Sequence, residues 1–132
     1  MIRIENPFLP TSGYTAMTLW PLILIRTDLA HRYTPLVERH EQIHARQQQE
    51  MLAVGAVLAA VLAVAGCGWW SLLAVPLFLW WYWVEWSLRA LWYGSNAMAY
   101  RRLLFEQEAY DRQQDPGYLD SRRPFAWLGY MR

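Results

Sequence analysis

The sequence predicts a mainly α-helical, integral-membrane protein that forms a single domain of residues 1–132. Its length suits one domain, and its 55% apolar and 17% charged residues reverse the balance found in disordered chains. The run Met51–Val84 contains 34 residues without a charge, although the mean hydropathy of the whole chain is only +0.01. A His-Glu-x-x-His pattern, which suits one face of a helix, stands shortly before this run. In chain order we expect an N-terminal β-hairpin and loop at 1–33, a long motif helix at 34–50 that runs into a two-helix transmembrane hairpin at 51–86, a further helix carrying a glutamate ligand within 87–115, and an interfacial tail at 116–132.

The N-terminal segment Tyr14–Arg26 is expected to form a short β-hairpin. It mixes Thr, Ile, Leu and aromatic residues, which favour strands. Pro21 marks an interruption or an edge position, because proline cannot donate a hydrogen bond to a sheet. The same residues also suit an apolar loop pressed on a membrane surface, so both interpretations stay open.

The segment that begins at Thr34 has the start signals of a helix. Thr34 can cap it, Pro35 suits the first helical position, and acidic residues follow in the first turns. No helix breaker precedes the uncharged run. The motif helix is therefore expected to continue into the first membrane arm.

His40 and His44 stand four residues apart in the motif HEQIH. On a helix they share a face, so both imidazoles can bind one Zn²⁺ while Glu41 activates a water. The alternative is a polar amphipathic helix whose histidines merely face solvent.

The uncharged run is too long for one membrane crossing, which needs about 20 apolar residues. Glycines stand at its midpoint, where a helical pattern breaks most readily. We therefore expect two arms, Met51–Ala65 and Trp69–Trp86, joined by a tight turn. Tryptophans at the turn and at the far end of the second arm fit the two headgroup interfaces of a bilayer. A hairpin buried in a soluble helical bundle is the alternative.

Arginines predict the orientation in the membrane. The turn has none, whereas Arg39 and Arg46 precede the first arm and Arg89, Arg101 and Arg102 follow the second. Because basic residues concentrate on the cytoplasmic side, both termini are expected in the cytoplasm.

A catalytic zinc site needs a third protein ligand beside two histidines. Ser95–Gln114 is predicted to form one helix, capped at its start and closed by an Asp-Pro-Gly turn. Glu106 lies on the small and apolar face of this helix, which suits inward packing, and is the preferred ligand. Glu108 lies on a polar face with Arg112 at i+4, the spacing of a surface ion pair, so it ranks second. His31 is the remaining alternative.

The order of these motifs resembles the gluzincin membrane proteases of the HtpX and CAAX prenyl endopeptidase type. In those proteases an HExxH helix is followed by membrane helices and by a helix with an E-x-x-A motif, which Glu106 and Ala109 match here. Tyr110 stands where the family usually has Asp. The chain is also similar to small bacterial membrane proteins that carry HE-x-I-H and FE-x-EAY.

The resemblance implies an integral-membrane zinc metallopeptidase of the bacterial inner membrane, which hydrolyses a peptide bond with a zinc-activated water at the cytoplasmic face. It implies that His40, His44 and Glu106 hold Zn²⁺ and that Glu41 is the general base. The β-hairpin would then offer an edge strand to a peptide or membrane-protein substrate. The candidates for a donor to the oxyanion are Tyr110, Tyr100, Tyr93 and His31.

Composition narrows the partners. A net charge of +1 gives no electrostatic footprint for nucleic acid, and the single cysteine, Cys67, allows no disulfide within the chain. The lipid bilayer is the expected partner. A homodimer through Gly55, Ala59 and the neighbouring small residues is one interpretation of the first arm, and packing against the second arm is the other. A catalytically inactive or purely metal-binding membrane scaffold is the alternative function, and a membrane protein without metal is the third.

Overall fold

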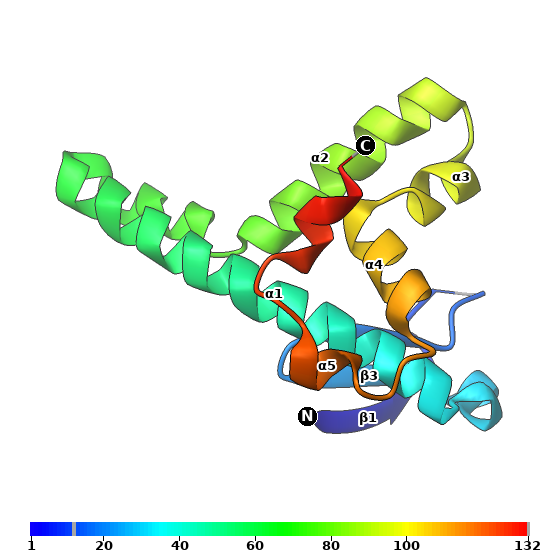
Figure 1. Cartoon of the computed structure of the whole chain (residues 1–132). Helices are drawn as coiled ribbons and strands as arrows, with labels where there is room; N and C mark the ends of the chain where they lie inside the picture. Colours follow the sequence, from blue (N-terminus) through cyan, green and yellow to red (C-terminus); the bar gives the residue numbers. More distant parts are fainter. Residues whose placement is uncertain (12, 132) are drawn as a thin grey trace.

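A computed structural model describes residues 1–11 and 13–131 (Figure 1). The chain is mainly helical with one small sheet, which confirms that part of the predicted fold class. The elements in chain order are β1 (Ile2–Asn6), β2 (Ala16–Leu19), β3 (Leu22–Arg26), the 3-10 helix η1 (Thr27–Arg32), α1 (Pro35–Leu62), the π-helical turn η2 (Ala63–Cys67), the 3-10 helix η3 (Gly68–Ala74), α2 (Leu77–Tyr93), α3 (Asn96–Arg101), α4 (Leu104–Arg112), α5 (Tyr118–Ser121) and the 3-10 helix η4 (Ala126–Tyr130).

The three strands form a sheet in the order β1-β3-β2. β2 and β3 pair antiparallel with Leu19 opposite Leu22, so the predicted β-hairpin is confirmed and Pro21 lies in its turn. β1 pairs parallel to β3 and adds a strand that the sequence did not indicate. β2 is the strand that packs against α1, and it forms one edge of the sheet.

The other elements assemble around α1. Thr34 caps this helix by accepting a hydrogen bond from the Val37 amide at 3.4 Å, and Pro35 is its first residue, as predicted. The helix has 28 residues and runs unbroken from the motif into the uncharged run. By length and composition the helical stretch Pro35–Ala74 is able to cross a membrane, as core helices of soluble proteins and signal sequences also are.

The predicted two-helix hairpin is wrong. The chain does reverse at the expected glycines, where Gly66 and Gly68 have positive φ angles of 92° and 54°. The returning segment is the short helix η3, which packs along α1, and α2 then departs in another direction (Figure 1). Pro76 lies at this second break. Its ring and its missing N–H are incompatible with the interior of one straight arm.

Small residues of α1 serve the packing of η3. A Cβ on Gly55 would lie 2.5 Å from the carbonyl oxygen of Ala74 and 2.7 Å from that of Val75. Gly55 therefore lets the end of η3 approach the α1 backbone, and Ala59, one turn further on, is also buried. Contact with η3 accounts for these two residues, and the homodimer stays a prediction.

The single helix predicted for Ser95–Gln114 is also wrong, because the chain forms α3 and α4 with a break at Leu103. Ser95 caps α3 by accepting from the Met98 amide, as predicted. The carboxylate of Glu85 caps α4, because its Oε1 accepts from the Leu104 amide at 3.0 Å. Glu85 also pairs with Arg89, one turn further along α2, at 2.8 Å.

The core lies where α1, α2, α4 and η4 meet. Met51, Leu104, Phe105 and Trp127 form its buried cluster. The rings of Trp127 and Phe105 lie 4.7 Å apart between centroids. Trp127 belongs to the segment expected as an interfacial tail, and this part of the tail is core.

Candidate metal centre

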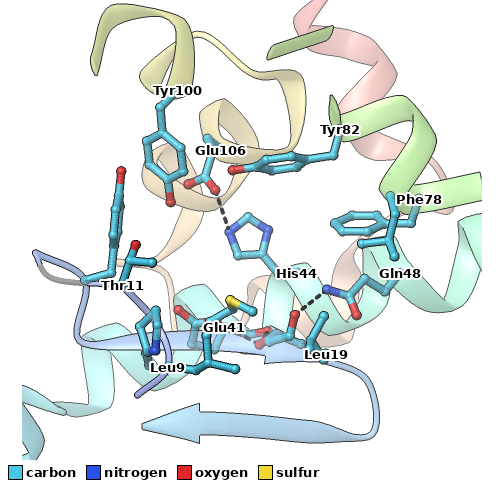
Figure 2. Close-up of a pocket in the computed structure, with 16 residues that line it drawn as sticks. Leu9, Thr11, Leu19, Glu41, His44, Gln48, Phe78, Tyr82, Tyr100 and Glu106 are labelled. Atoms are coloured by element: carbon cyan, nitrogen blue, oxygen red, sulfur yellow. Dashed lines mark hydrogen bonds and ion pairs between the residues drawn. The ribbon is translucent and has the colours of Figure 1, made fainter. Parts of the chain in front are cut away.

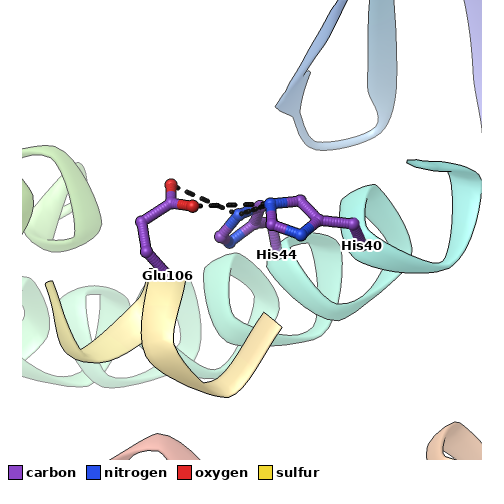
Figure 3. A group of neighbouring side chains, drawn as sticks. All are labelled: His40, His44 and Glu106. Atoms are coloured by element: carbon purple, nitrogen blue, oxygen red, sulfur yellow. Dashed lines mark hydrogen bonds and ion pairs between the residues drawn. The ribbon is translucent and has the colours of Figure 1, made fainter. Parts of the chain in front are cut away.

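Three predicted ligands converge on one point. His40 and His44 project from α1 and Glu106 from α4 (Figure 3). The two histidine Nε2 atoms lie 3.1 Å apart. Glu106 Oε2 lies 3.4 Å from His40 Nε2, and Glu106 Oε1 lies 3.4 Å from His44 Nε2. The structure thus brings together the residues that the sequence selected as the ligand set.

Local structure explains this convergence. The i, i+4 spacing places both imidazoles on the side of α1 that α4 covers. Glu106 stands in the first turn of α4, next to the core residue Phe105, and is 3% exposed. The cluster is therefore a buried one, held between two packed helices.

The Glu106 carboxylate and the His44 imidazolium stabilise each other's charged form. Burial on its own would raise the pKa of Glu106 and lower that of His44. The attraction between the two groups and their hydrogen bond outweigh burial, so the pKa of Glu106 falls below its usual value and that of His44 rises above it. Without metal, the cluster is a buried ion pair. Metal binding has to displace the proton from His44.

The spacing of the ligand atoms fits a metal ion of the size of zinc. Bonds of 2.0–2.2 Å at the tetrahedral angle separate the ligand atoms by roughly 3.3–3.6 Å. The two histidine nitrogens lie 3.1 Å apart, and each lies 3.4 Å from one oxygen of Glu106, which is close to that range. Within the described part of the chain, buried Glu106 Oε2 accepts no hydrogen bond. This oxygen lies 3.4 Å from His40 Nε2, and a metal ion held between the two atoms would give it a partner. Two imidazoles and a carboxylate are a familiar catalytic zinc set, although other divalent metals also bind such donors.

Glutamine side chains hold the far nitrogen of each histidine. His44 Nδ1 lies 2.8 Å from Gln47 Oε1, and His40 Nδ1 lies 3.2 Å from Gln113 Oε1. The Gln47 amide oxygen only accepts, so His44 Nδ1 carries the proton and His44 Nε2 is directed to the shared point. The sequence did not single out these glutamines, since no motif marks a neutral amide. Only the i+3 spacing of Gln47 from His44 was a usable signal.

Glu41 is buried beside the cluster, and its carboxylate accepts a hydrogen bond from a residue of the sheet. The Thr18 hydroxyl of β2 lies 2.8 Å from Glu41 Oε2 and 3.0 Å from the Glu41 carbonyl oxygen. Its single proton can serve either acceptor. Thr18 is 5% exposed, so the contact is shielded from water. The sequence predicted Glu41 as a functional residue, but it gave no hint of Thr18.

A cavity of about 380 Å³ adjoins the cluster (Figure 2). Its floor is α1, where Glu41 and His44 face it, and β2 forms one wall. Phe78 and Tyr82 of α2 and Tyr100 of α3 form the opposite side. The predicted carboxylate base and two of the three metal ligands thus border one largely apolar space.

Of the four predicted oxyanion donors, Tyr100 lines the cavity. Burial followed by the charge of Glu106 raises the pKa of Tyr100, which keeps its hydroxyl a donor at neutral pH. Tyr110 packs its ring edge-on against His40, 4.7 Å between centroids, and is 45% exposed. His31 is exposed on η1, and Tyr93 ends α2. Among these four, the geometry favours Tyr100, whereas Tyr110 stays a prediction.

The two alternative ligands lie elsewhere in the part of the chain that the structure describes. Glu108 is fully buried and binds Arg122 and Gln47, so the predicted surface pair with Arg112 is wrong. Arg112 instead lies 3.5 Å from Asp111. The metal group contains Glu106 as its only carboxylate among the described residues.

Comparisons of the chain with protein-family models, with curated proteins and with solved structures find no match. The resemblance to gluzincin proteases therefore rests on the motif residues alone.

Proposed function

We propose that the protein is a membrane-associated zinc metallopeptidase that hydrolyses a peptide bond at the cluster of His40, His44 and Glu106. The observation that carries the proposal is the spacing of 3.1–3.4 Å among the three ligand side chains. The buried carboxylate of Glu41 and a cavity lie next to them. A structural metal site has no need of that extra carboxylate or of an adjoining cavity.

The residues of the chain have distinct tasks in such a reaction. When bound, zinc would supply a nucleophilic water at neutral pH and polarise the substrate carbonyl. Glu41 takes one proton from the attacking water, whose oxygen bonds to the carbonyl carbon, and later delivers that proton to the amine as the C–N bond breaks. Thr18 holds Glu41 Oε2 and fixes the carboxylate. The Tyr100 hydroxyl, protonated at neutral pH, can donate to the developing oxyanion.

The open edge of β2 supports an extended polypeptide as substrate. Thr15 O accepts from Arg26 N, which identifies the side of β2 that faces β3. Because strand hydrogen bonding alternates, the backbone groups of Ala16 and Thr18 face the other side. Gln48 binds the Thr18 carbonyl and the Trp20 amide there and closes that end of the edge. Ala16, which also lines the cavity, is left for a substrate strand.

Exposed apolar residues support association with a lipid bilayer. Only 17% of the most apolar window of the helical stretch Pro35–Ala74 is buried, whereas the core helix of a soluble domain would be mostly covered. Exposed large side chains continue onto α2. They include Val57, Val61, Val64, Trp69, Trp70, Trp83 and Leu88. With arginines on both flanks of the uncharged run, we place both termini and the metal cluster on the cytoplasmic side.

The test measures metal content and hydrolysis on the detergent-solubilised chain. We expect about one zinc per chain by elemental analysis, lost in His40→Ala. Glu41→Gln should keep the metal and lose hydrolysis of a quenched fluorogenic casein, because only the proton carrier is removed. Wild-type protein without zinc would refute the metal site, and equal hydrolysis by wild type and Glu41→Gln would refute the catalytic role.

A purely metal-binding scaffold is the second candidate. One observation favours it, which is that the Thr18 hydroxyl donates to Glu41 Oε2 and so occupies an oxygen that a proton carrier would use. Zinc bound by wild type and by Glu41→Gln, with casein left intact by both, is the result expected of the scaffold.

A further inference from the structure

Gln47 lies directly behind the metal cluster and is fully buried. Its Oε1 lies 2.8 Å from His44 Nδ1. Its Nε2 donates to Glu108 Oε2 at 2.9 Å and to the Phe105 carbonyl at 3.1 Å. The side chain therefore links α1 to the α4 helix that carries the third ligand.

These partners leave the Gln47 amide one orientation. The Phe105 carbonyl and the Glu108 carboxylate only accept hydrogen bonds, so the amide nitrogen has to face them. The amide oxygen then faces His44 and has to accept from an Nδ1–H. The lone pair of neutral His44 is consequently on Nε2, the atom that faces His40 and Glu106.

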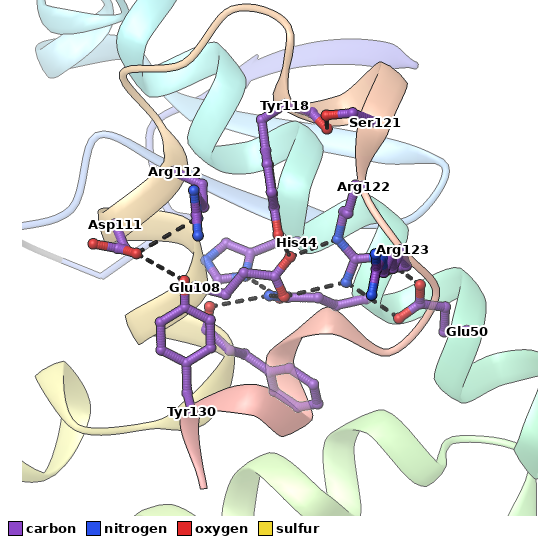
Figure 4. A network of polar contacts seen from close by, with 12 residues as sticks. His44, Glu50, Glu108, Asp111, Arg112, Tyr118, Ser121, Arg122, Arg123 and Tyr130 are labelled. Carbon is purple, nitrogen blue, oxygen red and sulfur yellow. Dashed lines mark hydrogen bonds and ion pairs between the residues drawn. The ribbon is translucent and has the colours of Figure 1, made fainter. Parts of the chain in front are cut away.

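A buried ion pair holds Glu108 in turn (Figure 4). Arg122 Nε donates to Glu108 Oε1 at 2.5 Å and Arg122 Nη2 to Oε2 at 3.1 Å, while the Tyr118 hydroxyl donates to Oε1 at 2.9 Å. The Arg122 side chain is 4% exposed and that of Glu108 0%. Arg122 also pairs with Glu50 of α1. One arginine from the C-terminal segment thus fixes the carboxylate that orients Gln47.

We propose that Gln47 is a positioning residue for the metal ligand His44, and that Arg122 fixes its orientation through Glu108. The inference rests on the proposed metal site. His40 provides an internal comparison, since its partner Gln113 is half-buried and lies at 3.2 Å. A shorter, fully buried contact orients its ligand more strictly, so the loss of Gln47 should weaken metal binding more than the loss of Gln113.

The experiment compares Gln47→Met with two matched variants, Gln113→Met and Gln42→Met. Gln42 is on the same helix, donates to Glu38 and lines a different hollow beside Arg3, which makes Gln42→Met the control. Zinc affinity is measured by competition with a chromophoric chelator on detergent-solubilised protein. We expect a loss of about 10–100-fold for Gln47→Met, a smaller loss for Gln113→Met and no change for Gln42→Met. Gln47→Met that binds zinc as tightly as Gln42→Met would overturn the proposal.

Nuclear magnetic resonance of the His44 ring supplies a second readout that a merely structural role of Gln47 would not move. The Nδ1–H proton is present in both the imidazolium and the metal-ready tautomer. In wild type it should exchange slowly with water, with or without zinc, and Arg122→Lys should speed its exchange because the bidentate fork is lost. Fast exchange in wild type would overturn the proposal even if Gln47→Met does not fold. Slow exchange in a wild type that binds no zinc would refute the metal site and keep the positioning contact.

Discussion

Replacement of Arg122 by Met is expected to destabilise the protein by several kcal/mol. The change removes the guanidinium from a carboxylate, Glu108, that is fully buried. Breaking a buried pair from one side costs about 3–5 kcal/mol, because the remaining charge stays out of water. Tyr118 and Gln47 still donate to Glu108, which sets the expected loss near the lower end, at about 3 kcal/mol. Glu50 is 15% exposed and regains water, so it adds little.

The assay is equilibrium unfolding of the solubilised protein, followed by the near-ultraviolet circular dichroism of packed aromatic residues such as Trp127. Arg112→Met is the matched control, because the Arg112 side chain is 48% exposed beside Asp111 and should lose less than about 1 kcal/mol. Adding Glu108→Gln to Arg122→Met removes the stranded charge and should restore about half of the lost stability. The reasoning is refuted if Arg122→Met is no less stable than Arg112→Met.

Three further predictions address the cluster, the reversal of the chain and the carboxylate base. In metal-free protein, the raised pKa of His44 stabilises the fold fully below about pH 6.5, and this contribution is lost as the pH rises towards 9. The lowered pKa of Glu106 stabilises the fold fully above about pH 4.5, and this contribution is lost as the pH falls towards 2. The melting temperature of wild type in a chelator should therefore exceed that of Glu106→Gln most between pH 4.5 and 6.5, and a pH-independent difference would contradict the ion pair. Gly55→Ala should lower the free energy of unfolding by about 1–3 kcal/mol in the same assay, because its Cβ pushes η3 away from α1. Gly129→Ala is the control and should cause no such loss, because its Cβ would have no atom of the described chain within 4 Å. Thr18→Val should leave zinc affinity unchanged and slow hydrolysis about tenfold, since it frees the base carboxylate, and full activity would show that this contact is dispensable.

The parts of the site that sequence predicted are those that local periodicity controls. The i, i+4 histidines share a face on any helix. Glu106 was preferred over Glu108 on the apolar face of a single helix Ser95–Gln114, which the chain does not form, and both glutamates are buried. The prediction that Glu108 is solvated failed for a different reason. Its partner Arg122 is 14 residues away and reaches it only through the fold of the C-terminal segment.

The break between α3 and α4 shows the same limit of local rules. The residues around Leu103 contain neither glycine nor proline, so the pattern predicted one helix. The start of α4 is fixed by the carboxylate of Glu85, which caps Leu104 from 19 residues earlier in the chain. A cap supplied by another helix leaves no mark in the neighbouring sequence.

The failure of the straight second arm bears directly on the site. A continuous helix over Trp69–Trp86 would have lain along α1, with its aromatic residues directed at the bilayer. Because Pro76 interrupts it, α2 starts anew and carries Phe78 and Tyr82 to the cavity wall. Phe78 stacks on Phe105 with 4.8 Å between ring centroids, which ties α2 to the first turn of the helix that bears the glutamate ligand. The uncharged segment therefore supplies two things at once, an apolar surface outside and one wall of the cavity within. If the proposed function holds, a substrate bound in the cavity would lie against Phe78 and Tyr82 of this segment.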